Sequence, residues 1–108
     1  MNLHIQEKGC KDKEILVLDT RLPYFYHKVK ELFQKEPEEV NIVLINNKEE
    51  FTQIVGEGFN ECSYSEGNVI YIYEPNQFGI ATSISRENFY EVLCQELIHL
   101  FYKENKLS

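Results

Sequence analysis

The residues with the most reactive side chains lie near the C-terminal end of the chain, in a helical pattern that follows Ser85. Gln95 and His99 are four residues apart, so in a helix they share one face, and Glu96 lies beside them. An imidazole can bind a metal ion or transfer a proton, and a carboxylate can act as a general base. These three residues form the candidate site.

The apolar residues of the same segment indicate which side of the helix is buried. Three leucines fall within roughly 60° of one another on a helical wheel, namely Leu93, Leu97 and Leu100. Glu96 lies at the margin of this stripe, where a carboxylate is costly unless it is paired or used. We expect a protein donor such as Arg86, Lys103 or a backbone N–H to pair with it.

The string Gln95-Glu96-Leu97-Ile98-His99 differs by one letter from HExxH, the motif of zinc metallopeptidases. Together with the elements predicted around it, over residues 40–104, it resembles the minimal gluzincins of the zincin-like metallopeptidase family. In that family two His residues bind zinc, and the Glu acts as general base on the metal-bound water. The resemblance implies that Glu96 is a general base, that His99 is a zinc ligand and that Gln95 replaces the other ligand.

The resemblance also implies a peptide-binding strand. In that family the strand before the active-site helix runs along the cleft and pairs with extended peptide substrates. Its counterpart by position is a predicted strand composed of Val69, Ile70, Tyr71, Ile72 and Tyr73.

Two departures from the family pattern argue against a working zinc centre. The amide of Gln95 is a poor zinc ligand compared with imidazole. Gluzincins take a third ligand, a Glu, from a later helix, but only nine residues follow His99. Glu104 and Cys94 each lie about 140° from His99 around the helix, too far to bind the same ion. Glu96 and His99 are therefore expected to be vestigial, and no cofactor is expected.

The hydrophobic pattern predicts the elements of the first half of the chain. Residues 14–19 (EILVLD) are predicted to form a buried strand. Thr20 then caps a predicted helix that has Pro23 in its first turn and ends at residues 36–37. Residues 40–45 (VNIVLI) carry the strongest strand signal.

The second half is predicted to contain a short helix, a hairpin and the motif helix. Asn47 is expected to cap the short helix, which stops at Gly56. A hairpin is predicted around residues 65–68. Ser85 is expected to cap the last helix, which runs over residues 86–103.

This order of elements predicts an α+β fold with a small, twisted, mixed sheet and helices packed on one face. The first two predicted strands can pair in parallel through a right-handed crossover. We expect a single zincin-like domain over residues 1–108, either complete or truncated after the motif helix.

Composition excludes several classes of partner. Eleven Lys and Arg residues against eighteen Asp and Glu residues give a net charge of −7, which argues against nucleic acid and anionic membranes as partners. Cys10, Cys62 and Cys94 show no CxxC spacing, and the N-terminal residues do not resemble a signal peptide. We therefore expect a cytoplasmic protein.

Three functions remain open from the sequence. The first is a metallopeptidase-like domain that has lost catalysis and binds an extended peptide or protein partner. The second is an active zinc-dependent peptidase completed by ligands from another chain. The third is a small acidic inhibitor or immunity-type protein, whose charge steers it to a basic partner.

Overall fold

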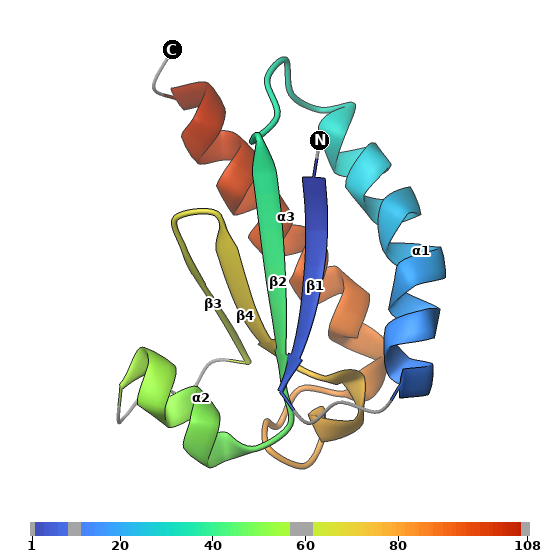
Figure 1. The fold of residues 1–108 in the computed structure, drawn as a ribbon, viewed down its shortest axis with the longest axis vertical. Coiled ribbons are helices and arrows are strands. Elements are labelled where there is room, and N and C mark those ends of the chain that lie inside the picture. The colour runs from blue at the N-terminus through green and yellow to red at the C-terminus, as the bar shows by residue number, and fades with distance from the viewer. Residues whose placement is uncertain (1, 9–11, 57–61, 107–108) are drawn as a thin grey trace.

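Four strands and three α-helices make up the part of the chain that the computed structural model describes, which is residues 2–8, 12–56 and 62–106. The strands are β1 (Asn2–Lys8), β2 (Glu39–Ile45), β3 (Ser63–Glu66) and β4 (Val69–Tyr73). The helices are α1 (Asp12–Lys30), α2 (Lys48–Val55) and α3 (Phe89–Lys106) (Figure 1). None of these helices combines the length and the apolar character needed to cross a lipid bilayer.

The strands form one mixed sheet with the order β1-β2-β4-β3. β1, β2 and β4 are parallel, because α1 returns the chain to the starting end of the sheet before β2, and β3 runs back in the opposite direction before β4. β3 is antiparallel to β4 and forms one edge of the sheet. The predicted α+β fold with a small mixed sheet is therefore confirmed.

The apolar stripe of α3 packs against one face of this sheet. Side chains alternate between the two faces of a strand, and the alternate residues that enter this core are at most 1% exposed, namely Val40, Ile42, Leu44, Ile70 and Ile72. Leu93, Leu97 and Leu100 of α3 belong to the same cluster and are 0%, 0% and 3% exposed. The predicted burial of these leucines is confirmed.

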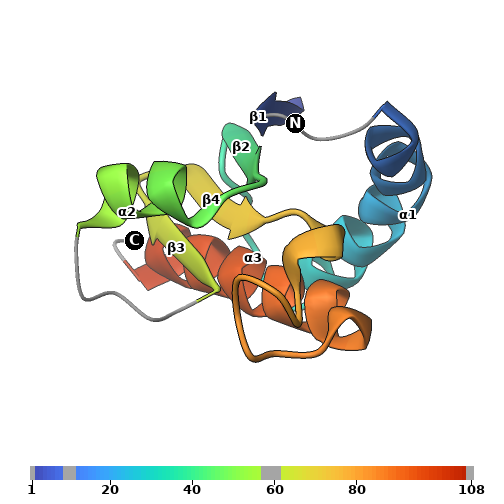
Figure 2. The ribbon, with the colours of Figure 1, turned by 90° about the horizontal axis from the view of Figure 1, so that it is seen from below.

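The expectation that all helices lie on one face of the sheet is wrong. In Figure 2, α2 lies on the opposite side of β3 and β4 from α3. The ring of Phe51 in α2 stacks on Tyr73 at the end of β4, with 4.6 Å between ring centroids. On this second face β2 and β4 carry mostly apolar side chains, namely Val43, Ile45, Val69, Tyr71 and Tyr73, which a helix on this side helps to cover.

The largest error of the sequence prediction concerns residues 14–19, which lie in α1 and not in a strand. A short apolar run does not distinguish a buried strand from a helix. The helical pattern becomes clear only further along the chain, where Leu22, Tyr26 and Val29 recur at helical spacing and are buried. Thr20 therefore does not cap the helix, and Pro23 lies inside it with its ring exposed.

The first strand is β1, which the sequence prediction missed. Apolar and polar residues alternate from Leu3 to Gln6, which is the period of a strand. β1 takes the place that we expected for residues 14–19, since it pairs in parallel with β2 and α1 connects the two.

Other local predictions are confirmed. The Asn47 side chain caps α2 by accepting a hydrogen bond from the backbone N–H of Glu50 at 2.8 Å. The predicted hairpin joins β3 to β4 through the two-residue turn Gly67-Asn68, with Gly67 at a positive φ of 60°.

The start of the last helix differs from the prediction. The Ser85 side chain makes no capping hydrogen bond, and a 3-10 turn (Arg86–Asn88) precedes α3. A similar turn (Pro75–Gln77) follows β4. These two turns together connect the sheet to the motif helix.

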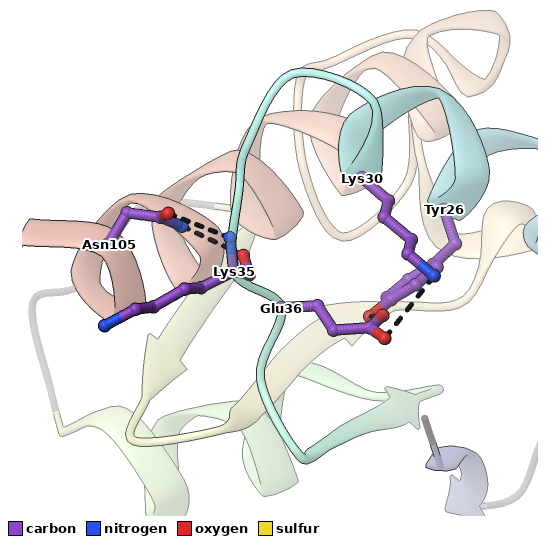
Figure 3. Close-up of polar contacts among 5 residues, drawn as sticks. All are labelled: Tyr26, Lys30, Lys35, Glu36 and Asn105. Carbon is purple, nitrogen blue, oxygen red and sulfur yellow. Dashed lines mark hydrogen bonds and ion pairs between the residues drawn. The ribbon is translucent and has the colours of Figure 1, made fainter.

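A group of polar contacts, here called the clasp, holds the loop between α1 and β2 against both long helices (Figure 3). Its members are Tyr26, Lys30, Lys35, Glu36 and Asn105. The Tyr26 hydroxyl donates to Oε2 of Glu36 at 2.9 Å, and Lys30 pairs with Oε1 at 3.4 Å. The Asn105 side chain accepts from the backbone N–H of Lys35 at 3.0 Å and donates to its carbonyl at 2.9 Å. The clasp thereby joins α1, the loop and the C-terminal part of α3.

Acidification should weaken this clasp through Glu36. Burial acts to raise the pKa of Glu36, but the Tyr26 hydrogen bond and the Lys30 charge outweigh it and hold the pKa below its ordinary value of 4.5. A carboxylate with a lowered pKa stabilises the fold above its unfolded-state pKa, and this stabilisation is lost as the pH falls through the folded-state value.

We therefore expect Glu36→Gln to lower the free energy of unfolding by up to about 1 kcal/mol at neutral pH. The effect should shrink towards zero well below pH 4.5, as measured by urea denaturation. Glu38→Gln, at an exposed position in the same loop, is the control. An effect of Glu36→Gln that did not change with pH would contradict the prediction.

Candidate functional site

An open groove lies between the edge strand β3 and helix α3. Its volume is about 770 Å³, and its lining from the strand is Ser63, Tyr64 and Ser65. The helix contributes residues spaced by three or four along one side, namely Gln95, Glu96, Ile98, His99 and Lys103. All three residues of the degenerate motif thus line one groove beside a sheet edge.

Glu96 is bound by the edge strand. The Ser63 hydroxyl donates to Oε1 of Glu96 at 3.1 Å. The other carboxylate oxygen, Oε2, is buried and has no hydrogen-bond partner in the described part of the chain. The donor is therefore a protein group, as expected, but it is a serine hydroxyl and neither Arg86 nor Lys103. Arg86 instead donates to Asn76 at 2.6 Å.

Gln95 and His99 are exposed along the groove, one turn apart on α3. Within residues 21–56 and 62–105, no group of three His, Cys, Asp or Glu side chains lies close enough together to hold a metal ion. Cys94 is half-buried, and burial raises the pKa of its thiol, which disfavours the thiolate that zinc requires. These residues do not fit the zinc centre of a gluzincin, since the site has one imidazole and an amide.

The expected peptide-binding strand lies inside the sheet. β4, which consists of Val69, Ile70, Tyr71, Ile72 and Tyr73, has β2 on one side and β3 on the other. Its backbone is therefore paired along both edges and cannot accept another strand. The edge beside α3 belongs instead to β3 (Figure 2). Sequence reasoning missed Ser63 and Ser65 for this reason.

The register of the hairpin shows which backbone groups of β3 face outward. The backbone N–H of Tyr73 donates to the carbonyl of Cys62 at 3.3 Å, and Tyr64 lies opposite Tyr71. In an antiparallel pair, inward hydrogen bonds are made by every second residue. The alternate residues Ser63 and Ser65 therefore direct their N–H and C=O groups away from β4, toward the open edge.

The two faces of β3 differ in character. The side chain of Ser63 lies on the α3 face, where it reaches Glu96, and Ser65 shares this face because it is two residues away. Tyr64 lies on the other face and stacks with Tyr71, with 6.3 Å between ring centroids. A strand added at this edge would therefore meet a polar groove on one face and aromatic rings on the other.

Comparisons with models of known protein families, with curated protein sequences and with solved structures found no match.

The ligand set predicts weak metal binding. We expect the purified protein to retain far less than one equivalent of zinc after dialysis, measured by elemental analysis. Gln95→His should not produce tight binding, because a third ligand would still be missing. Stoichiometric zinc in the wild-type protein would overturn this interpretation of the site.

The hydrogen bond between Ser63 and Glu96 predicts a difference between two serines of one strand. Ser63→Ala removes the donor to a carboxylate that already has one unpartnered oxygen, so it should lower the free energy of unfolding by about 1–3 kcal/mol. Ser65→Ala is a matched control, because Ser65 lies on the same face without such a bond, and it should cost less than about 0.5 kcal/mol. Equal losses in chemical denaturation would show that Glu96 does not depend on Ser63.

Proposed function

We propose that this chain is a zincin-like, metallopeptidase-like domain with a degenerate zinc motif, which binds an extended peptide or protein segment without hydrolysing it. The observation that carries the proposal is the open edge of β3 beside the groove of α3. Ser63 and Ser65 present backbone groups at this edge that pair with no strand in the described part of the chain, in the arrangement used by domains that bind peptides by strand addition.

Strand addition at β3 would use both the backbone and the groove. A bound segment would exchange hydrogen bonds with the outward N–H and C=O groups of Ser63 and Ser65. Its alternate side chains would then enter the groove beside Ile98 and His99 or lie against Tyr64 on the other face. Backbone pairing would supply affinity, and the groove would supply selectivity.

The position of the motif helix supports the zincin-like part of the proposal. The resemblance implies a helix that carries the motif next to a strand that pairs with extended peptides. Here α3 carries the degenerate motif, and the strand beside it with an open edge is β3. The hydrogen bond from Ser63 to Glu96 links the two elements directly.

The state of Glu96 supports a non-catalytic function. A general base must reach the proton that it abstracts at hydrogen-bond distance. One oxygen of Glu96 accepts from Ser63, and the other is shielded from solvent. The carboxylate therefore presents little accessible basic surface to a molecule in the groove, and among the residues that the structure describes His99 has no partner ligands for a catalytic zinc site.

A backbone-directed variant tests the proposal. We would select peptides from a displayed random library on the wild-type protein and measure their affinity by fluorescence anisotropy. Ser65→Pro removes an outward N–H without removing a bond to β4, and should weaken binding about tenfold. Ser65→Ala keeps the N–H and is the matched control, with affinity expected to stay within about twofold.

Two outcomes would contradict the proposal, provided that circular dichroism shows the variants to be folded. Peptides that bind Ser65→Pro as tightly as the wild type would place binding elsewhere. Hydrolysis of the same peptides, abolished both by a chelator and by Glu96→Gln, would establish an active zinc-dependent peptidase instead.

A further inference from the structure

The groove beside β3 continues along α3 into a second hollow. This hollow has a volume of about 310 Å³ and lies where the hairpin turn, the loop before β2 and the end of α3 meet. Its lining residues are Pro37, Gly67, Asn68, Leu100, Lys103 and Glu104. Lys103 lines both hollows and therefore lies at their junction.

Lys103 is the exposed charged residue that lines the first groove, although the chain as a whole carries −7, and its neighbour Glu104 lines only the second hollow. Lys103 is exposed and forms no ion pair with any residue in the described part of the chain. The one carboxylate of this groove is Glu96, and it is bound by Ser63 and partly shielded. At physiological salt, charges beyond about 8 Å are strongly screened, so local charges dominate for a segment in the groove.

The geometry also relates Lys103 to the backbone anchors. β3 and α3 run in the same direction, since Ser63 contacts Glu96 at one end while Gly67 and Lys103 line the same hollow at the other. The seven residues from Glu96 to Lys103 span about 10 Å of helix. The three steps from Ser63 to Glu66 span about 10 Å of extended chain, which is a similar length.

A bound segment that pairs with β3 as an added strand therefore places one particular residue near Lys103. Residues opposite Ser63 and Ser65 would share the face toward α3, and so would the next alternate residue of the bound segment, which lies beside the hairpin turn just beyond the end of β3. This residue is the one nearest Lys103, and it lies four positions from the residue opposite Ser63. It is N-terminal to that residue in antiparallel pairing and C-terminal to it in parallel pairing.

We infer that the segment bound at β3 is acidic, and that a carboxylate on the α3 face of this segment, near the hairpin turn, pairs with Lys103. The inference rests on the proposed function, and it adds the chemical class of the partner. The carboxylate belongs either to an Asp or Glu side chain or to the C-terminus of the bound chain.

The test uses short synthetic peptides of Thr, Val and Ser in which Asp, Asn or Lys is placed at each position in turn, with amidated C-termini. A second set has free C-termini, which distinguishes the two sources of the carboxylate. Affinities are measured by fluorescence anisotropy for the wild type, Lys103→Glu and the control Lys48→Glu. Lys48 is exposed on α2, which lies on the opposite face of the sheet (Figure 2).

We expect the wild type to prefer a carboxylate over Asn at one position by about threefold to fivefold. Lys103→Glu should lose this preference and favour the Lys peptide, while Lys48→Glu should behave as the wild type. Thermal melting by circular dichroism verifies that both variants are folded, and neither removes a buried group.

Each failure has a separate signature. If Asp and Asn peptides bind the wild type with equal affinity, and Ser65→Pro weakens the binding of both, the inference of an acidic partner is overturned and the proposed function stays intact. An Asp preference that persists in Lys103→Glu would also overturn it. Absence of binding of every peptide to the wild type would overturn the proposed function itself.

Discussion

Burial of the apolar stripe of α3 against the sheet is the constraint on which the rest of the structure depends. Leu93 and Leu97 are completely buried with Ile70 and Ile72, and each such side chain contributes on the order of 2 kcal/mol when it leaves water. With this stripe packed, α3 cannot rotate about its axis without exposing it. The residues at its margin therefore have fixed places, and Glu96 meets Ser63 of β3.

The groove follows from the hairpin that ends the sheet. β2 and β4 are parallel neighbours in the interior, but β3 turns back through Gly67 and leaves its outer edge without a strand in the described part of the chain. Edge strands present alternating unpaired backbone groups, which are binding sites unless they are covered. Since α3 runs beside this edge, the polar side of the helix and the open backbone face one another across the groove.

Under the proposed function, Glu96 has a structural role, whereas the corresponding Glu of the zincin motif acts as a general base. Its carboxylate lies at the rim of the core, where an unpaired charge is unfavourable, and the Ser63 hydroxyl satisfies one oxygen. The same bond ties the motif helix to the edge strand. The groove can therefore keep its shape without a metal ion, while Lys103 is the exposed charge along it.

Periodicity along the chain was sufficient for the elements whose pattern is local. The strand over residues 40–45, the Asn47 cap, the hairpin and the buried leucines of α3 could all be predicted, because they depend on neighbours within a few residues. The helical nature of residues 14–19 could not be predicted from the short run alone, since an apolar run suits either a strand or a helix.

The candidate residues Gln95, Glu96 and His99 were found from spacing, but the partner of Glu96 and the open edge were not. Strand order places β4 inside the sheet and β3 at its edge, and it is decided by packing between segments distant in sequence. Only the tertiary structure therefore determined that Ser63 and Ser65, rather than Val69–Tyr73, face the groove.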